Sequence, residues 1–255
     1  MRTANFSQIL FDALQYSGND RHNITAETFA QFRDFASARI REAWETIQWA
    51  DVCRLVEFTT TTDANGVISF SPAAEADEIL AVYTKNPQET TQAVQVPYQI
   101  YDSGSVRKII IGNGIVSGWY LYRKDCITLE GELYSPTVVY YQGVQVYFDS
   151  GSGTGTYTPV LGKPHAGNFY TCTVVSTTVG QNPNTHPASW TKIEIPYIFS
   201  AFMAWGAAAN WLVSEGQIQE APVIEAKAKE VIEQEYDKFL NQQGQYGKLN
   251  ITRTY

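Results

Sequence analysis

The sequence predicts an α+β protein in which both ends of the chain build one helical domain and antiparallel β structure is inserted between them. Three observations lead to this fold class. Apolar residues recur with helical spacing near both ends, and they alternate with the period of a strand through the middle of the chain. A stretch without charge, Pro196–Val213, stands where the β pattern gives way to the second helical region. The apolar faces at the two ends each need a partner, and each is the simplest cover for the other.

Two helices are predicted in the first part of the helical domain, residues 1–57. In Asn5–Tyr16 the apolar residues fall on one face, and Gly18 supplies a C-terminal stop. The second helix follows the N-cap residue Thr25 and runs from Ala26 to about Val52 with one apolar stripe. We interpret its other side as a solvent-exposed charged face, formed by Arg33, Asp34, Arg39, Arg41, Glu42 and Glu45.

An inserted β domain is predicted over residues 58–135. Asn65-Gly66 is a dipeptide that favours a hairpin turn between two short strands. Further runs rich in Thr, Val, Ile and Tyr are separated by turn residues, which is typical of a small antiparallel barrel or sandwich. These runs are Ile79–Tyr83, Val94–Tyr101, Lys108–Ile111, Val116–Arg123 and Ile127–Tyr134.

A second, smaller β module is predicted over residues 136–195, with strands at Val138–Phe148, Tyr157–Val160, Asn168–Val175 and Lys192–Ile195. Its aromatic residues are spaced as in the short β modules that bind chitin and cellulose, which it resembles. That resemblance implies sugar stacking on Tyr147, Tyr170 or Trp190. The alternative is that these rings form the core of a module with little else to bury, and we favour it because Trp190 leads directly into a strand and a buried helix.

The uncharged stretch Pro196–Val213 opens the second helical region, residues 196–243. A membrane span would need basic flanks and long aliphatic side chains, whereas this stretch is rich in Ala and Gly. We therefore expect a helix buried on every side, because small residues let other helices approach closely. Its positions Trp205, Ala208 and Trp211 are expected to pack against a neighbouring subunit.

The chain is expected to close with a further helix, Val223 to about Gln242, and an extended tail over residues 244–255. Gly244 and Gly247 are interpreted as ending that helix. The tail then alternates in the manner of a strand with no hairpin partner beside it in sequence. Its alternating side chains, predicted to bind a partner protein by adding a strand to its sheet, are Leu249, Ile251, Arg253 and Tyr255.

No pattern of catalytic chemistry stands out in the sequence. The three histidines lie in separate turns without a second ligand at metal-binding spacing, and the three cysteines are far apart. The net charge of −8 argues against a surface that binds nucleic acid. We therefore expect a protein that is not an enzyme, with no catalytic residues, no metal site, no cofactor and no membrane association.

Three segments carry a family resemblance: AWETIQWADV, STTVGQNPNTHPASWTKIEIPYIF, and EYDKFLNQQGQ in the last helix. Together they resemble the head-to-tail adaptor (connector, or head-completion) proteins of tailed bacteriophages. It implies a structural virion protein at the head-tail interface, made in the host cytoplasm and assembled as a dodecameric ring. The portal protein and tail or neck proteins would be its partners, the C-terminal tail would dock on the portal or a neighbouring subunit, and viral DNA would pass through without specific binding. Glycan binding for host or cell-wall attachment is the alternative function.

Overall fold

The computed structural model describes residues 2–21, 24–64, 66–103, 106–112, 114–149 and 166–251, with Ser103 and residues 242–251 described by their backbone alone. The chain divides into two compact units, one of Met1–Thr46 with Ile127–Tyr255 and the other of Ile47–Cys126. Both helices and antiparallel sheets are present, which confirms the α+β class. The inserted unit, Ile47–Cys126, begins and ends earlier in the sequence than the predicted 58–135, and the second β module belongs to the same compact unit as the helices.

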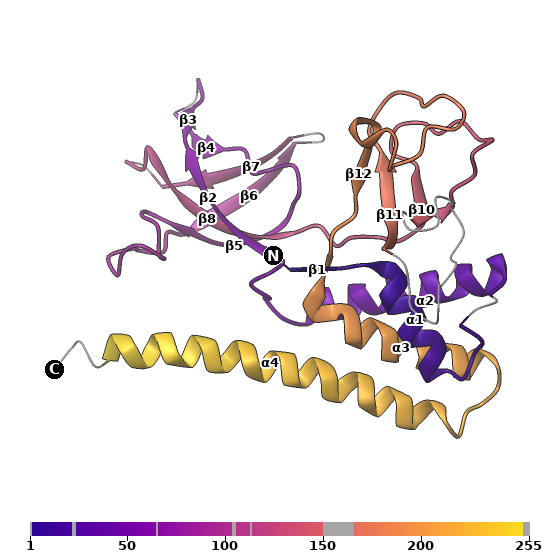
Figure 1. The fold of residues 1–255 in the computed structure, drawn as a ribbon. Helices are drawn as coiled ribbons and strands as arrows, with labels where there is room; N and C mark the ends of the chain where they lie inside the picture. Colours follow the sequence, from indigo (N-terminus) through magenta and orange to yellow (C-terminus); the bar gives the residue numbers. More distant parts are fainter. Residues whose placement is uncertain are drawn as a thin grey trace. The chain divides into compact units, whose positions relative to one another are not determined.

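Four α-helices are found in the described residues (Figure 1): α1 (Phe6–Tyr16), α2 (Ala26–Thr46), α3 (Ser200–Ser214) and α4 (Ala221–Ile251). The predicted C-terminal stop of the first helix and the predicted N-cap of the second helix are both confirmed. Gly18 follows α1 with a φ of 72°, and the Thr25 hydroxyl accepts the backbone N–H of Thr28 at 3.0 Å. α2 ends at Thr46, short of the predicted Val52, because the chain turns there and the N–H groups of Val52 and Cys53 bond to the Trp49 carbonyl.

The helix α3 is the centre of the helical layer. It follows a short 3-10 turn, η2 (Tyr197–Phe199), and packs against α1, α2 and α4. Eight of its residues are buried, Ala208 completely so. The expectation of burial on every side holds for most of the helix but not at Ala201 and Val213, which are exposed. In the described part of the chain, no helix combines the length and the apolar character that crossing a membrane requires.

The second β module forms a sheet in the order β12-β11-β10-β9. Its strands are β9 (Glu132–Leu133), β10 (Gln145–Asp149), β11 (Gly167–Cys172) and β12 (Trp190–Lys192), the last preceded by the 3-10 turn η1 (Pro187–Ser189). Neighbours pair antiparallel except β9 and β10, which are parallel. Beside this sheet, β1 (Thr3–Ala4) pairs with β13 (Ile195–Pro196), so the N-terminal segment lies against the strand that leads into α3.

Two predicted strands are shorter than expected in this sheet, one of them predicted for the inserted β domain (Ile127–Tyr134) and the other for the second module (Val138–Phe148). The run Ile127–Tyr134 yields only β9, and the run Val138–Phe148 becomes a strand only at Gln145. The reason for the second is a turn centred on Gly143, whose φ of 87° breaks the extended course. The predicted strand Tyr157–Val160 lies outside the described residues.

Aromatic rings join this sheet to the helices. Phe6 of α1 packs edge-on to Phe169 of β11, with ring centroids 4.7 Å apart, and Phe29 of α2 lies 4.9 Å from Tyr147 of β10. All four side chains are almost completely buried. Because such rings bury a large apolar area, this cluster explains why the module and the helices form one compact unit.

The other unit is wholly β in its described residues. Its strands are β2 (Cys53–Thr59), β3 (Thr61–Thr62), β4 (Ile68–Phe70), β5 (Ala76–Tyr83), β6 (Tyr98–Ser103), β7 (Val106–Ile111) and β8 (Ser117–Lys124). They form the antiparallel sheets β2-β8-β5 and β3-β4-β7-β6. The core contains Phe58 stacked on Phe70 at 4.0 Å, with Tyr120 beside them. The turn at Gly66, with a φ of 80°, lies between β3 and β4 as predicted.

Candidate functional site

The two tryptophans of α3 pack inside the chain. Trp205 stacks on Tyr16 of α1 with ring centroids 3.5 Å apart, and Trp211 stacks on Phe32 of α2 at 4.9 Å. Ala208, between them, has no exposed surface. The prediction that Ala208 packs against a neighbouring subunit is therefore wrong, since its side chain already lies within the core of its own chain.

A buried arginine joins three helices at one point. Arg39 of α2 donates two hydrogen bonds to the carboxylate of Glu225 on α4, at 3.1 and 2.6 Å, and one to Asn210 Oδ1 on α3, at 2.8 Å. Its side chain is only 12% exposed. The guanidinium fork suits such bidentate recognition of a carboxylate. Arg39 therefore fixes the position of α4 on the helical layer.

Gly206 of α3 makes room for this arginine. A Cβ atom at residue 206 would lie 2.7 Å from both Cδ and Nε of Arg39, closer than real Cβ contacts. The glycine is helical rather than left-handed, so it is required here for space and not for a special backbone conformation. The interpretation of Arg39 as part of a solvent-exposed face is wrong for this reason: the side chain crosses α3 to reach α4.

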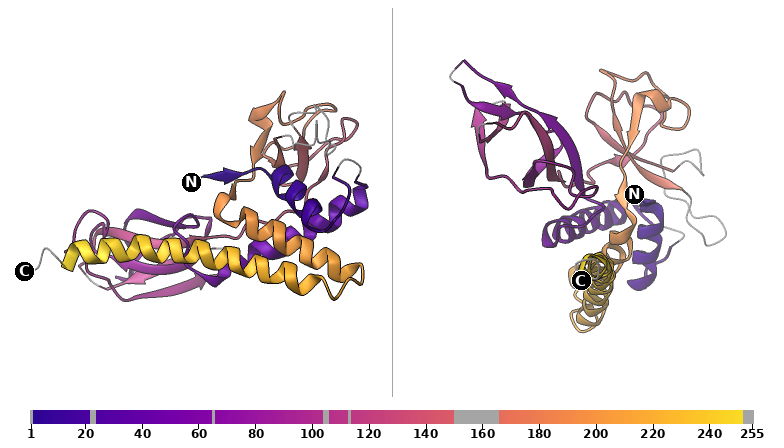
Figure 2. Two further views of the ribbon diagram at one scale, coloured as in Figure 1. Left: turned by 60° about the horizontal axis from the view of Figure 1, so that its bottom comes forward. Right: turned by 90° about the vertical axis from the view of Figure 1, so that its left-hand side faces the viewer.

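The helix α4 is much longer than the helix it packs on. With 31 residues it is ~46 Å long, whereas the 15 residues of α3 span ~22 Å. The two run side by side in opposite directions, and α4 continues past the N-terminal end of α3 (Figure 2). In the stretch 221–241 the buried side chains are Ala221 and Ala228, both in the first part of the helix, while Leu240 in the second part is 43% exposed. We refer to residues 237–251 as the distal half of α4.

The predicted extended tail is helical over most of its length. α4 includes residues 244–251, so Leu249 and Ile251 belong to a helix and not to a strand. Gly244 and Gly247 do not end it: each costs only about 1 kcal/mol relative to Ala in a helix interior, which neighbouring helical residues can offset. Arg253 and Tyr255 lie outside the described residues.

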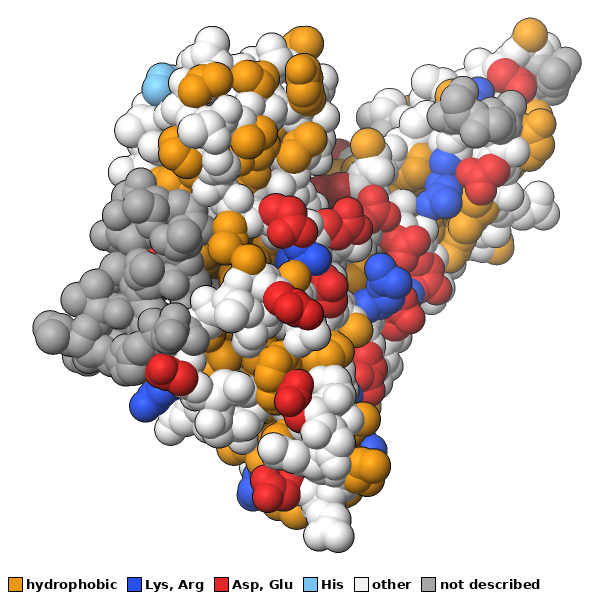
Figure 3. All heavy atoms as spheres, turned by 90° about the vertical axis from the view of Figure 1, so that its right-hand side faces the viewer, with side chains coloured by type: hydrophobic (Ala, Val, Ile, Leu, Met, Phe, Trp, Pro, Cys, Tyr) orange, Lys and Arg blue, Asp and Glu red, His pale blue; other side chains and the backbone are white. Residues whose placement is uncertain are grey.

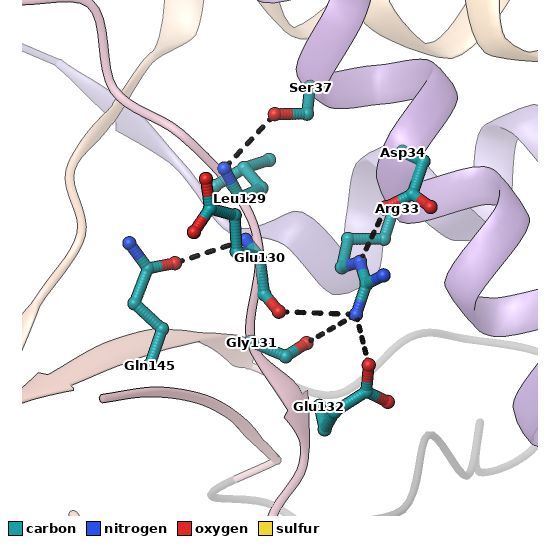
Figure 4. Close-up of polar contacts among 8 residues, drawn as sticks. All are labelled: Arg33, Asp34, Ser37, Leu129, Glu130, Gly131, Glu132 and Gln145. Carbon is teal, nitrogen blue, oxygen red and sulfur yellow. Dashed lines mark hydrogen bonds and ion pairs between the residues drawn. The ribbon is translucent and has the colours of Figure 1, made fainter. Parts of the chain in front are cut away.

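A second buried arginine ties α2 to the β module (Figure 4). Arg33 Nη1 donates to the carbonyls of Glu130 and Gly131 and to Glu132 Oε1, and its Nε donates to Asp34. Burial lowers the pKa of Arg33, but its bonds to Asp34 and Glu132 outweigh that effect and raise the pKa overall. Arg33 was expected on a solvent-exposed face, and the structure corrects this, because the guanidinium satisfies carbonyl groups that enter β9.

The aromatic residues proposed to bind glycans mostly form the core of the module. Tyr147 is fully buried and Trp190 is 6% exposed, with its indole N–H donating to the Gln181 carbonyl at 3.2 Å. Neither ring offers a face for sugar stacking, so the glycan-binding role of these two residues is contradicted. Tyr170 is half-buried and packs near Phe148.

The module also exposes apolar side chains, but they lie on two loops and not at Tyr147 or Trp190. Two loops, 135–144 and 173–180, lie side by side through backbone hydrogen bonds from Gln142 N–H to the Val175 carbonyl and from Thr177 N–H to the Tyr140 carbonyl. They expose five aliphatic and aromatic side chains: Val138, Val139, Tyr141, Val144 and Val175. Three of these also line a groove of about 530 Å³ beside β9, whose lining includes Glu130 and Glu132.

Groups with altered acidity do not gather into one site. Burial raises the pKa of the Cys53 thiol, with Arg123 and Arg54 opposing the shift, so the thiol stays protonated and weakly nucleophilic. Burial and a hydrogen bond to Glu75 raise the pKa of Tyr122 far above its ordinary value. Among the described residues there is no group of three or more His, Cys, Asp or Glu side chains placed to hold a metal ion.

No family model matches the chain, and no curated protein matches it.

Sequence reasoning missed both arginine contacts. In sequence, Arg33 and Arg39 are two cations on the polar side of an amphipathic helix, where exposed charges are the usual finding. A weak signal existed for Arg39, since Gly206 interrupts an alanine-rich helix and Asn210 and Glu225 add polar groups to otherwise apolar helical faces. No comparable signal existed for Arg33, because two of its acceptors are backbone carbonyls.

Proposed function

We propose that this protein is a structural adaptor of a tailed-phage virion, which joins the portal to the tail or neck as an oligomeric ring. The observation that carries the proposal is the distal half of α4, which extends past the helix that α4 packs on. A helix that projects from a fixed base can lay one side into a groove on a partner protein. The sequence resemblance to phage adaptors supports the same role.

The base of this helix supports a load-transmitting role. Arg39 holds the first part of α4 by a bidentate ion pair, and the α3–α4 connection is short, with Gly216 at a φ of 77°. The direction of the distal half is therefore set by the helical layer rather than by a flexible hinge. We propose that the distal half docks on the portal or on a neighbouring subunit, as a helix in place of the strand first expected.

The charge of the chain is compatible with a DNA conduit. A net charge of −8 on each subunit would repel DNA that passes through a ring, which keeps the DNA from adhering. In this role the protein carries no catalytic activity and uses no cofactor. The virion, at the head-tail interface, is its proposed location.

The proposal is tested by mixing the full chain with the portal protein encoded in the same genome and imaging the mixture by negative-stain electron microscopy. We expect an added ring of density at one end of the portal. A chain ending at residue 236 should be folded by circular dichroism and should add no density. Portal particles that look the same with and without the full chain would contradict the proposal.

A further inference from the structure

The groove of about 530 Å³ beside β9 combines aliphatic and acidic side chains in its lining, and we call it the β9 groove. Its aliphatic lining includes Val138, Val139 and Val144, and its acidic lining is formed by Glu130 and Glu132. Figure 3 shows apolar side chains over the upper part of the module, while acidic side chains gather elsewhere. A ligand for this groove must therefore suit carboxylates and aliphatic groups at the same time.

Positive charge is scarce around the β9 groove. The described ranges 126–149 and 166–191, which carry the module, contain three acidic residues and no Lys or Arg. The cation that reaches the acidic side of the groove is Arg33 of α2. Its side chain is only 10% exposed and is already paired with Asp34 at 2.8 Å and with Glu132 at 2.7 Å. It is therefore not available to a ligand.

The two glutamates of the groove remain open to a cation from outside. Figure 4 shows the carboxylate of Glu130 pointing away from Arg33, and Glu130 has no ion pair among the described residues. The side chain of Glu132 is 76% exposed in spite of its bond to Arg33. The groove thus keeps an excess of negative charge, and a cationic group is its electrostatic complement.

The strand β9 adds backbone groups to the same groove. It is the edge strand of the sheet β12-β11-β10-β9, and Leu133 lines the groove. The Tyr134 N–H bonds to the Tyr147 carbonyl of β10. Because successive residues of a strand direct their backbone groups to opposite edges, the N–H and carbonyl of Leu133 point away from β10. An extended peptide can bond to these two groups as a further strand would.

The wall of the groove formed by residues 135–144 is held in place by the rest of the module. The Tyr140 N–H donates to Thr177 Oγ1 at 2.9 Å, and the Tyr140 hydroxyl accepts the Ser135 N–H at 2.7 Å. The buried ring of Tyr140 packs on Trp190. A ligand would thus meet a preformed wall and would not need to order this loop, which lowers the entropic cost of binding.

From these observations we infer that the β9 groove binds an extended segment of a partner protein, with a Lys or Arg between small apolar residues. The cation pairs with Glu130 and Glu132, the aliphatic stem and the apolar neighbours cover the valines, and the backbone bonds to Leu133. An uncharged partner would cover the carboxylates without pairing them. A second copy would bring a further net charge of −8 to an acidic groove. The site is separate from the distal half of α4 and goes beyond the adaptor proposal.

Fluorescence anisotropy with the full chain and a labelled peptide tests the inference. The probe is a short blocked peptide that alternates Thr and Val around one central Lys, a composition that favours an extended backbone. We expect saturable binding with a dissociation constant that rises with salt, because salt screens the attraction. Norleucine in place of the central Lys keeps the apolar stem without the charge and should weaken binding at least about threefold. Methylation of the peptide nitrogens that face β9 should weaken it as well, because it removes backbone donors.

Variants of the chain locate the contact. Glu130→Gln should weaken binding of the Lys probe at least about threefold, and Val139→Thr should weaken it by removing apolar contact while keeping the shape of the side chain. The matched control is Glu194→Gln. Glu194 is also exposed, but it follows β12 at the opposite edge of the sheet, so this variant should bind as the parent chain does. All three variants should keep the far-ultraviolet circular dichroism of the parent.

Several results would overturn the inference. One is the absence of saturable binding by the Lys probe, and others are equal binding of the Lys and norleucine probes or equal binding by Glu130→Gln and Glu194→Gln. Spermidine that competes with the probe, together with no effect of peptide methylation, would assign the groove to a free amine. Dimerisation in sedimentation velocity that is lost in Val139→Thr would assign it to a second copy. The assay contains no portal protein, so its failure leaves the adaptor proposal to its own test.

Discussion

Arg39 of α2 and Glu225 of α4 form a bidentate ion pair across the helical layer, with Nη1 3.1 Å from Oε1 and Nη2 2.6 Å from Oε2. The two residues are far apart in sequence and come from opposite ends of the chain. Gly206 of α3 leaves free the space that the Arg39 side chain occupies on its way to Glu225. The pair is thus the point at which the N-terminal helices determine the direction of the C-terminal helix.

Replacing Gly206 by alanine should destabilise the protein by about 1–3 kcal/mol, the usual cost of overpacking a well-packed interior. The added Cβ would collide with Cδ and Nε of Arg39. Urea unfolding followed by circular dichroism measures the change. The decisive control is the same substitution in an Arg39→Ala background, where it should be neutral or stabilising by up to about 1 kcal/mol because alanine favours helix. Equal destabilisation in both backgrounds would show that Arg39 is not the obstacle.

Glu225→Gln should also destabilise the chain, by about 1–3 kcal/mol, because it removes the bidentate carboxylate partner of the largely buried Arg39 and leaves only Glu42, at 3.0 Å, to pair with that charge. The matched control is Glu230→Gln, since Glu230 pairs with Lys227 on the same helix but at the exposed surface. That change should cost less than about 0.5 kcal/mol. Thermal unfolding of the two variants gives the comparison, and similar melting temperatures would contradict the assigned role of Glu225.

Arg33→Lys should loosen the segment that enters β9. Lysine keeps the charge but cannot reproduce the set of bonds that the Arg33 guanidinium makes to Asp34, Glu132 and the carbonyls of Glu130 and Gly131. Hydrogen exchange of the peptide that covers residues 129–134 should accelerate several-fold, whereas Arg41→Lys at an exposed position of the same helix should leave it unchanged. Unchanged exchange in Arg33→Lys would mean that the strand is held by the sheet alone.

The pH dependence of stability offers a test at α1. Burial raises the pKa of Asp12 above its ordinary value of 3.8, while the bond from Gln8 and the charge of Arg21 oppose the shift. An acid whose pKa is raised by folding favours the folded state fully below its unfolded pKa, and this contribution is lost as the pH rises through the folded pKa. Asp12→Asn should therefore be more stable than the parent at pH 7, and the difference should disappear near about pH 3.

Thermal unfolding at both pH values measures this effect, with Asp237→Asn at an exposed position of α4 as the control. The control should show no comparable gain at pH 7. An Asp12→Asn variant that is less stable than the parent at pH 7 would show that its interaction with Arg21 outweighs burial.

How far the sequence predicts this fold depends on whether the relevant interactions are local. The helix starting after Thr25, the stop at Gly18 and the turn at Gly66 follow from neighbouring residues, and the structure confirms them. The burial of α3 follows from its lack of charge. The pairing of β1 with β13, by contrast, joins segments that are far apart in the sequence, and no pattern in Thr3–Ala4 reveals it.

The errors at the candidate site arise because the structure of a short segment depends on the elements next to it and packed against it. An alternating pattern in the last residues was interpreted as a strand, but the preceding helix continues through 244–251, because a helix adds residues cooperatively once formed. Trp190 and Tyr147 have the composition of a sugar-binding surface and yet fill a small core. Which face of a strand is buried depends on the elements that cover it. α1 and α2, from another part of the chain, cover Tyr147, whereas Trp190 packs on Tyr140 within the module.

The central claim is that the distal half of α4 docks on a partner ring, and the most direct measurement is the affinity of point variants for the portal protein. Leu240 and Val223 are both exposed on α4, but only Leu240 lies in the distal half. By biolayer interferometry with immobilised portal, Leu240→Glu should weaken binding at least about tenfold, and Val223→Glu should bind as the parent chain does. Equal binding by both variants, or no binding by the parent chain, would contradict the account.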